Sequence, residues 1–450
     1  MKNIQKMNLF DAVMLVMGSM IGSGIFIVSA SMSRELLSPE MLLLAWVVTG
    51  LFTLLAALSY AELGAAMPKA GGQYVYLQAA YGKLFGFLYG WTLFTVIQTG
   101  TIAAVAVAFA KFTGVLFPQI SEQNVLLQIA GFKLSAVQVL AILTIFLLTA
   151  SNFREIKKAA LLQNIFTVSK VLALLFLIGS GFYWLMGSNS SQWNFSWSGI
   201  SFSTISPALF AAALVGSIFS SDAWNNITFS ASEINQPEKN LPKALVIGTS
   251  GVTLLYVLAN IMYLKVLPFD MVQQAPSDRV GTVFMQTLFG EFGAVLMAVL
   301  IMISTFGCIN GLTLSGARVY YAMAKDGLFF KQAATLNQNQ SPQVALLIQG
   351  IWAAILTLSG SYGDLLDYVV FAVLLFYILT VAAVFVLRKK QPQMLRPYKV
   401  LAYPIIPLLY MLFATGICIS LLILKPEFSY PGLGIVLAGI PIYYWLQKKA

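Results

Sequence analysis

The chain has 450 residues, of which 59% are hydrophobic and 9% charged, and its formal net charge is +10. Soluble domains carry about 25% charged residues, so this composition excludes an ordinary soluble protein and predicts a membrane protein. The chain has no histidine, which excludes Ser-His-Asp hydrolysis and histidine-ligated zinc. Since it also has no nucleotide-binding Walker loop, we expect no cofactor and no metal ion.

Apolar runs of about 20 residues follow one another along the chain, each long enough to cross a bilayer. They cover about residues 9–32, 40–66, 84–113, 134–151, 159–186, 205–232, 242–266, 288–323, 342–358, 364–387, 401–424 and 431–447. No long polar linker interrupts them. We therefore expect one membrane domain over residues 1–450, an all-α membrane protein with 12 transmembrane helices.

Most of the 26 lysines and arginines fall on the side of the membrane that holds Met1. Those expected on the other side are Arg34, Lys111, Lys133, Lys265, Arg279 and Lys425. The positive-inside rule then places both termini in the cytoplasm of a multi-pass protein in the cell (inner) membrane. Because the basic residues flank spans that face the lipid bilayer, the net charge indicates no nucleic-acid partner.

The first span contains the stretch GSMIGSGIF, residues 18–26, whose glycines and serines are poor helix formers. In hydrocarbon, backbone groups freed by a broken helix stay unpaired unless they line a cavity and bind a ligand. The amides of Ser23, Gly24 and Ile25 are placed to begin a second half-helix, whose positive dipole end suits a carboxylate. Carbonyls around Met20 suit an ammonium group. Together the two describe a site for an α-amino acid.

The sixth span carries a similar stretch, GSIFSSD, which begins at Gly216. Five spans separate it from the first, so the two halves of the chain have opposite topology. Interrupted segments at matching positions of inverted halves point to a transporter binding site. Chance is the alternative, since Gly-Ser pairs are common packing positions in membrane helices.

Five motifs extend in order over nearly the whole chain. They are GSMIGSGIF from Gly18, YAELGAAMPKAGGQYVYLQAAYG from Tyr60, DAWNNITFSASEINQPEKNLPKAL from Asp222, NGLTLSGARVYYAMAKDGLF from Asn310 and RPYKVLAYPIIP from Arg396. Together they resemble the amino acid–polyamine–organocation (APC) superfamily, specifically a bacterial homologue of its L-type amino acid transporter (LAT) branch. Gln73 departs from that branch, which usually has Glu or Asp there.

The resemblance implies a LeuT-like fold of 5+5 inverted repeats, about residues 9–186 and 205–387, with discontinuous helices 1 and 6. Helices 11 and 12 follow over about 401–447. It implies that helix 1 amides bind the substrate carboxylate and that helix 6 supplies a gate and carbonyls for the amino group. The substrate-binding residues expected on these grounds are Met20, Ile21, Gly22, Ser23, Gly24, Ile25, Phe219, Ser220, Asp222 and Asn225.

Lys170 lies about 11 residues into the fifth span, roughly 17 Å deep at 1.5 Å per residue, which is near the middle of a hydrocarbon core about 30 Å thick. One interpretation is a structural ammonium satisfied by carbonyls. The other is a tethered cation where sodium-coupled relatives of the fold bind their ion, and the family's lysine at the matching place favours it. We expect gating or coupling roles for Lys170 and Phe219, with Ser304 as a partner of Lys170.

Asp222 stands where much of the branch has Gly, Ser or Ala. It could meet the substrate α-ammonium, which we expect, or a cationic side chain, or take up a proton. The alternative is a structural role for Asp222, either in an ion pair or as a helix cap. For Glu62, Asp11 and Arg318, near cytoplasmic span ends, we expect gate or scaffold ion pairs.

These observations predict a sodium-independent amino acid transporter that is not an enzyme. We expect an exchanger of neutral L-amino acids, with cationic ones as a further option, that works by alternating access. Proton-coupled symport, with Asp222 or Glu62 titrating, is the alternative within transport. A channel needs charged or carbonyl rings from repeated subunits, and a membrane enzyme needs clustered His, Cys or paired carboxylates. Neither pattern is evident.

Animal members of the branch attach to a glycoprotein subunit through a cysteine between helices 3 and 4. Here the corresponding polar loop, about residues 114–133, contains no cysteine. The resemblance therefore predicts amino acid substrates but no disulfide-linked heavy subunit.

Overall fold

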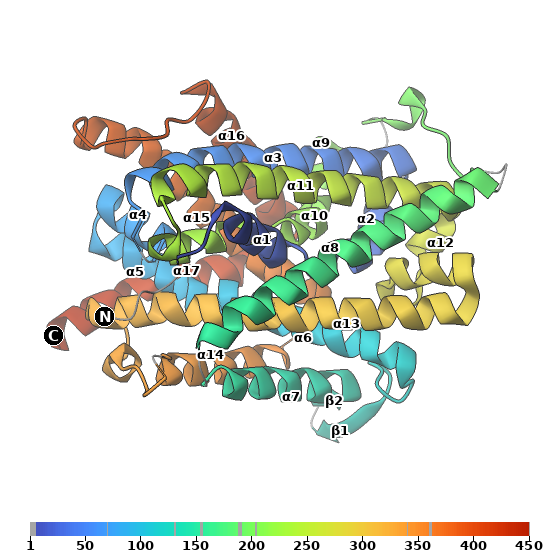
Figure 1. Ribbon diagram of the computed structural model, residues 1–450, viewed down its shortest axis with the longest axis horizontal. Helices are drawn as coiled ribbons and strands as arrows, with labels where there is room; N and C mark the ends of the chain where they lie inside the picture. The colour runs from blue at the N-terminus through green and yellow to red at the C-terminus, as the bar shows by residue number, and fades with distance from the viewer. Residues whose placement is uncertain are drawn as a thin grey trace.

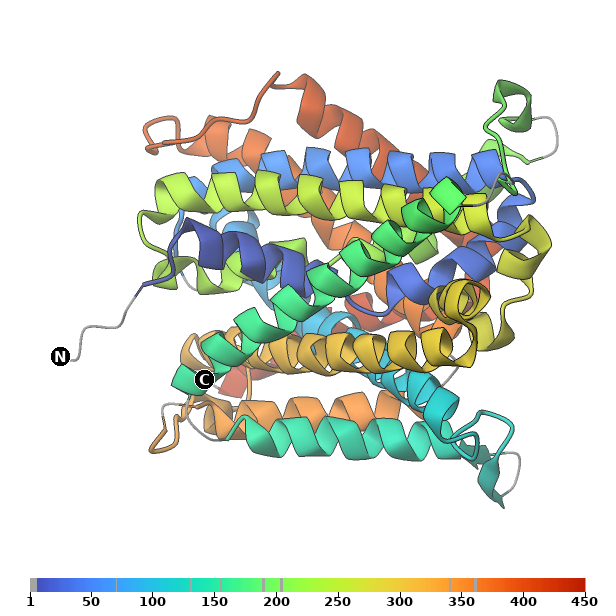
Figure 2. The same ribbon diagram turned by 45° about the vertical axis from the view of Figure 1, so that its right-hand side comes forward.

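The computed structural model of the chain describes residues 6–69, 71–129, 132–153, 156–187, 191–202, 205–339, 341–359 and 362–449. Most of its helices run along one direction and form a single bundle (Figure 1 and Figure 2). Among the described residues, eight helices are long and apolar enough to cross a membrane, or nine if a bent pair counts as one span. The prediction of an all-α membrane protein is confirmed at this level.

The elements are as follows. The long helices are α3 (Pro39–Ala66), α6 (Gln98–Leu116), α8 (Ile156–Gly187), α11 (Pro237–Val266), α13 (Val280–Lys325), α15 (Tyr362–Lys390), α16 (Ile405–Leu424) and α17 (Pro426–Lys449). The shorter helices are α1 (Leu9–Met20), α2 (Gly24–Leu36), α4 (Gln73–Tyr81), α5 (Lys83–Thr92), α7 (Ala136–Ser151), α9 (Pro207–Ala213), α10 (Val215–Ser220), α12 (Phe269–Gln273) and α14 (Gln343–Leu356). Short 3₁₀ or π segments are η1 (Leu93–Ile97), η2 (Trp197–Gly199), η3 (Trp224–Glu233), η4 (Pro276–Asp278) and η5 (Lys331–Ala334).

Each expected apolar run coincides with one helix or with a consecutive set of helices. The helices often extend beyond the apolar run, because capping residues rather than hydropathy decide where a helix begins. Thus α11 begins at Pro237, before the run expected from 242, with proline in its first turn and Glu238 at its positive dipole end.

One element is not helical. Strands β1 (Val125–Ile129) and β2 (Phe132–Ser135) pair antiparallel, with Gln128 opposite Lys133. The sequence indicated only a polar loop at about 114–133. This hairpin connects α6 to α7 and projects from the bundle at the end away from both termini (Figure 1).

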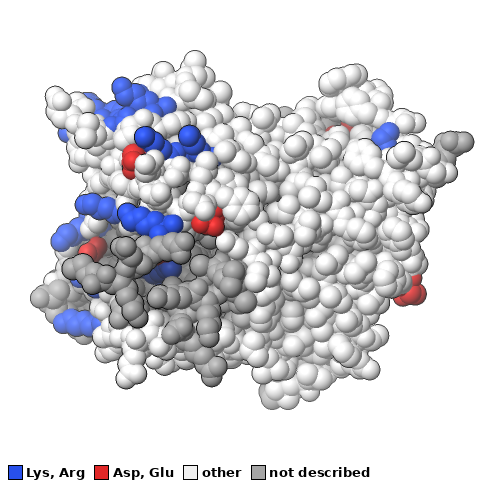
Figure 3. All heavy atoms as spheres, viewed as in Figure 1, with Lys and Arg blue, Asp and Glu red and all other residues white. Residues whose placement is uncertain are grey.

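The two ends of the bundle differ in charge. Both termini lie at one end (Figure 1), and the lysines and arginines of the visible face gather there (Figure 3). We call it the basic end, and the end with the hairpin and α12 the opposite end. Such an asymmetry is typical of a membrane protein whose cytoplasmic loops are positive.

The broken first span lies inside the bundle. Its first half, α1, packs against α8 and α11, and its second half, α2, packs against α10 and α13. Around this core, α3 and α11 lie side by side, and α13 lies beside α6 and α8 (Figure 1 and Figure 2). The break is therefore enclosed by protein, where irregular backbone can exist at membrane depth.

Candidate functional site

The first span is interrupted at the residues that the sequence indicated. Helix α1 ends at Met20, Ile21 is extended with ψ 97°, and α2 begins at Gly24 at an angle of 41° to α1. A Cβ added to Gly24 would lie 2.0 Å from Ser220 Oγ and 3.0 Å from Ser220 Cα. Only glycine permits this approach, so the breaks of the first and sixth spans touch here.

The carbonyls freed at the end of α1 meet side chains from other helices. Lys170 of α8 is fully buried, and its Nζ donates to Gly18 O over 2.7 Å. The ammonium is thus held by a carbonyl at the negative end of a helix dipole. Ser304 is not its hydrogen-bond partner, contrary to the prediction. The Ser304 hydroxyl is buried without a recorded partner among the described residues.

Tyr256 of α11 joins the two breaks. Its hydroxyl lies 3.0 Å from Met20 O and 3.1 Å from Ser220 O, the carbonyls at the ends of α1 and α10. A phenol has one proton and can donate to only one of them at a time. An ammonium group has three donors and could satisfy both carbonyls, which is compatible with the ammonium site that the sequence predicts around Met20. Sequence reasoning missed Tyr256.

The amides that follow the first break have no such partners. In the described part of the chain, no acceptor is recorded for the N–H groups of Gly22, Ser23, Gly24 and Ile25, which are all buried. The first amide beyond them to bond is that of Phe26, to Ser23 O at 3.0 Å. Buried N–H groups without acceptors are costly. At the start of the 13-residue helix α2, such N–H groups are suited to an anion.

The sixth span is also broken. Helix α10 ends at Ser220, Ala223 adopts φ 64°, and η3 continues from Trp224. A left-handed alanine costs roughly 1–2 kcal/mol, and strain of this kind is found where neighbouring structure imposes it, often at functional sites. The second interrupted segment predicted from GSIFSSD is therefore present.

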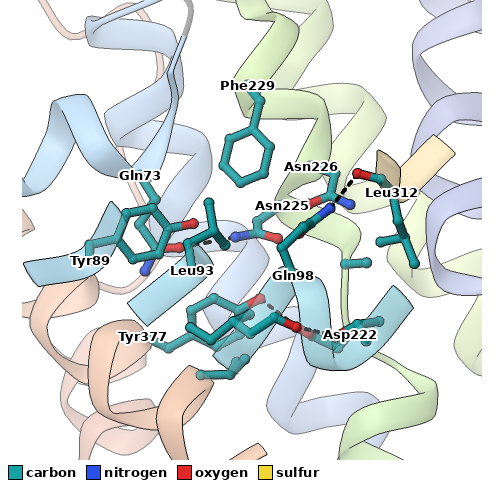
Figure 4. A pocket seen from close by; sticks show the side chains of 14 residues that line it. Gln73, Tyr89, Leu93, Gln98, Asp222, Asn225, Asn226, Phe229, Leu312 and Tyr377 are labelled. Atoms are coloured by element: carbon teal, nitrogen blue, oxygen red, sulfur yellow. Dashed lines mark hydrogen bonds between the residues drawn. The ribbon is translucent and has the colours of Figure 1, made fainter. Parts of the chain in front are cut away.

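Two small cavities meet at this second break. Both are lined by Thr101, Asp222, Ala223 and Leu312. The break cavity is further lined by Ser19, Met20, Gly22, Ser23, Gly24, Val105, Phe219, Ser220 and Cys308. The amide cavity is further lined by Gln73, Tyr89, Leu93, Ile97, Gln98, Asn225, Asn226, Phe229, Val373 and Tyr377 (Figure 4). The centre of a water molecule has about 20 Å³ available in each, enough for one or two waters. An amino acid therefore enters only after helices or side chains move.

Asp222 is the only charged side chain among the described residues that line the two cavities. It accepts a hydrogen bond of 2.5 Å from Tyr377 of α15. Tyr60 and Trp224 surround that phenol, with ring centroids 5.6 and 5.3 Å from it. Ala223 rather than Asp222 is the N-cap of η3, and no ion pair of Asp222 is recorded in the described residues. The cap and ion-pair alternatives therefore lack support.

Neutral side chains fix the walls of the amide cavity. Asn225 Nδ2 donates to Gln73 Oε1 over 3.0 Å, and Gln73 Nε2 donates to Thr380 Oγ1 over 2.9 Å. Gln98 Nε2 donates to Leu312 O over 2.7 Å (Figure 4). Asn225 thus belongs to the amide cavity, and Gln73, which departs from the LAT pattern, is its partner.

Tyr362, at the start of α15, contacts two residues that line the break cavity. Its hydroxyl lies 3.2 Å from Ser23 Oγ, and its ring meets Phe219 edge to face with centroids 6.1 Å apart. Phe219, expected as a gate, therefore lies against a second aromatic residue that sequence reasoning missed.

Glu62 forms the expected scaffold ion pair at the basic end. Its carboxylate is 2% exposed and accepts two hydrogen bonds from Arg388, at 2.8 and 2.6 Å. Arg396 Nε lies 3.6 Å away, and the amide of Val400 donates over 2.8 Å. A carboxylate held by two guanidinium groups and an amide fits the structural role expected for Glu62.

The ion pairs predicted for Arg318 and Asp11 at the basic end have different outcomes. Arg318 forms an ion pair with Glu233 at 3.0 Å, as expected. Asp11 has no recorded ion pair among the described residues. Instead it completes a capping box with Asn8, at 3.0 and 2.9 Å, and accepts a bond of 3.3 Å from Asn164. An acidic residue in the first helical turn is stabilised by the free amides and the dipole there.

The chain is similar to known proteins over almost its full length. Residues 7–443 match the protein family described as amino acid permease. The chain is 33% identical over 460 residues to the large neutral amino acids transporter small subunit 2 of Mus musculus, covering 99% of this chain and 82% of that protein. It is 30% identical over 448 residues to the serine/threonine exchanger SteT of Bacillus subtilis (strain 168), covering 99% and 97%. It is 29% identical over 446 residues to the b(0,+)-type amino acid transporter 1 of Mus musculus, covering 98% and 88%.

Proposed function

Because the chain belongs to the amino acid permease family of the APC superfamily, we propose that it is a sodium-independent exchanger of neutral and cationic L-amino acids. As a member of that family it is a multi-pass membrane transporter of amino acids and not an enzyme. Exchange is supported by the similarity to a relative described as a serine/threonine exchanger.

The family implies the LeuT fold, and the proposal includes it. Twelve transmembrane helices then form two inverted repeats, about residues 9–186 and 205–387, with α16 and α17 added. The breaks between α1 and α2 and between α10 and η3 occupy matching positions of these repeats. The basic end faces the cytoplasm with both termini, in keeping with the positive-inside rule.

The observation that carries the proposal is the pairing of two complementary backbone sites. Unpaired amides at residues 22–25 bind the substrate carboxylate, and the carbonyls of Met20 and Ser220 bind its α-ammonium. Both groups are backbone atoms at helix ends, which carry partial charges of the required signs. Such a site recognises the carboxylate and α-ammonium groups that all α-amino acids share. The side chain must then be recognised by other residues.

We propose that the amide cavity recognises the side chain of the substrate. It adjoins the break cavity at Asp222, and four amides and two phenols lie among its otherwise mostly apolar lining residues. These groups favour side chains that donate hydrogen bonds, and the carboxylate favours a cation. Acidic amino acids are disfavoured by charge repulsion.

Counterflow in proteoliposomes tests this function against proton symport. We expect uptake of radiolabelled serine or leucine only into vesicles loaded with an unlabelled amino acid. An imposed pH gradient should leave that uptake unchanged. Uptake into empty vesicles that follows the pH gradient would favour symport, and a panel of competing amino acids would then define the substrates in either case.

Sodium should not be required. The Lys170 ammonium, bound to Gly18 O, would repel a sodium ion 4 Å away by about 4 kcal/mol at an effective dielectric constant of 20. We expect uptake within about twofold of the original value when choline replaces sodium, which corresponds to less than 0.5 kcal/mol. A tenfold drop would contradict the tethered-cation role of Lys170.

The amide of Ser23, not its hydroxyl, should hold the substrate. We expect Ser23→Ala to retain uptake within about threefold, since its hydroxyl makes only the bond to Tyr362. Ser23→Pro removes the N–H and should weaken binding roughly 10- to 100-fold, the usual value of a hydrogen bond to a charged group. The measurement is the half-saturation constant for uptake by each variant in proteoliposomes. Equal losses in the two variants would assign the role to the hydroxyl.

We also propose that the transporter works without a disulfide-linked heavy subunit. The segment between α6 and α7 has no cysteine and forms the β1–β2 hairpin. The two cysteines of the chain, Cys308 and Cys418, are both buried.

A further inference from the structure

A buried cation lies at the opposite end of the bundle, outside the two cavities. Lys111 of α6 has a side chain that is 7% exposed. Its ammonium lies 3.2 Å from Glu122 Oε1, and the Glu122 side chain is 43% exposed. A buried ammonium is therefore neutralised by a carboxylate that water can reach.

Lys111 lies on the helix that leads away from the substrate site. On α6, Thr101 lines both cavities and Val105 lines the break cavity. Lys111 follows Val105 by six residues, about 9 Å farther along the helix at 1.5 Å per residue. That direction leads to the opposite end, where α6 meets the hairpin (Figure 1).

One aromatic ring connects Lys111 to the carboxylate site. The Lys111 ammonium lies 5.9 Å from the ring centroid of Tyr362, and the Tyr362 hydroxyl contacts Ser23 Oγ at 3.2 Å. Ser23 is the N-cap of α2 and one of the residues with unpaired amides. Tyr362 thus stands between two groups that attract anions and contacts both of them.

The charges around Lys111 allow an incoming anion to replace Glu122. Arg279 donates to the Lys111 carbonyl over 3.0 Å, and its guanidinium is attracted by Glu122. Asp278 is next in the chain, but its carboxylate is already paired with Arg34 at 2.8 Å. Glu122 is thus the ion-pair partner of Lys111, and Arg279 is a second cation next to that lysine. An incoming carboxylate can take the place of Glu122 without leaving the buried ammonium unpaired.

We propose that Lys111 is a second carboxylate-binding site, which holds the α-carboxylate of an amino acid entering from the opposite end, and that Glu122 occupies this site when no substrate is there. The inference rests on the proposed function and on the basic end being cytoplasmic. The substrate carboxylate passes from Lys111, beyond Tyr362, to the amides at the start of α2.

Substitutions of Lys111 and Glu122 should have different effects if the ion pair is purely structural than if Glu122 occupies a substrate site. If the pair only fastens the loop after α6, removing either partner weakens the protein in the same way. If Glu122 competes with the substrate, removing it frees Lys111, and the two substitutions act in opposite directions. Sidedness is a second criterion, because substrate arriving from the basic end does not pass Lys111.

The test measures half-saturation constants for serine from each side, in proteoliposomes of both orientations. From the opposite end, we expect Lys111→Gln to raise the constant about fivefold and Glu122→Gln to lower it about two- to threefold, with maximal rates nearly unchanged. Constants from the basic end should not move. Lys425→Gln is the matched control, because Lys425 pairs with Asp367 and Glu35 at the same end without contacting Tyr362.

Several outcomes would overturn the inference. These are equal shifts from both sides, a rise of the constant in Glu122→Gln, no shift in Lys111→Gln, or a shift of the same size in Lys425→Gln. Transport by the wild-type protein in the same vesicles separates these outcomes from a failure of the proposed function, which would abolish uptake in every sample.

Discussion

Gly24→Ala should lower amino acid uptake at least 100-fold, since misplacing a binding group by about 1 Å can cost roughly that factor. The new methyl group would lie 2.0 Å from Ser220 Oγ and 3.0 Å from Ser220 Cα. Part of this contact is backbone, so rotating a side chain cannot relieve it. The start of α2 must move away from the end of α10, and the amides and carbonyls proposed to hold one substrate then separate.

Gly22→Ala is the matched control for that experiment. A Cβ at Gly22 has Cys308 Sγ as its nearest neighbour, at the ordinary contact distance of 3.5 Å. It removes no N–H, so we expect uptake within about threefold of wild type. Both variants should be compared at equal amounts of folded protein, by size-exclusion chromatography in detergent. If Gly24→Ala transports as well as Gly22→Ala, the contact between the two breaks does not hold the substrate site together.

The second large effect should appear in Asp222→Asn, and only for some substrates. Leaving a buried cation without its partner costs about 3–5 kcal/mol, so we expect lysine and arginine uptake to fall at least about 100-fold. Serine and leucine should lose less than about fivefold. The reason is position: Asp222 lines both cavities, while the carbonyls near Tyr256 already provide an ammonium site.

Tyr377→Phe is the companion variant for Asp222→Asn. It keeps the aromatic ring but removes the donor that binds Asp222 at 2.5 Å. We expect a modest change, less than about tenfold, because the carboxylate itself remains. Competition constants for a panel of labelled amino acids provide the readout. Equal weakening of all substrates in Asp222→Asn would instead mean that Asp222 meets the α-ammonium, as the sequence alone suggested. No change for any substrate would remove Asp222 from the site.

Features that depend on neighbouring residues were predictable from the sequence. Hydropathy is a property of consecutive residues, so the apolar runs coincide with helices, although several helices extend beyond their runs. The breaks were found because glycine and serine weaken a helix at their own positions. Lys170 was placed at depth by its distance along one span, and its burial agrees with that position.

Partners that lie far apart in the chain were not predictable in the same way. Tyr256 is 236 residues from Met20, and Tyr377 is 155 residues from Asp222. No local pattern distinguishes these tyrosines from others in apolar helices. For the same reason, Ser304 of α13 is the partner that the sequence suggests for Lys170, whereas the acceptor is a backbone carbonyl of α1. Which side chain reaches a freed backbone group is decided by how the helices pack.

The burial of Glu62 has a consequence for how the protein is made. Its partner Arg388 comes 326 residues later, which takes a ribosome roughly 15–65 s at 5–20 residues per second. During that interval Glu62 lacks the guanidinium partner that it has in the folded protein. Synthesis of α15 and of the segment before α16 then supplies Arg388 and Arg396, the two guanidinium partners of Glu62. A chain that stops short of Arg388 would leave Glu62 buried without this guanidinium partner, which costs several kcal/mol.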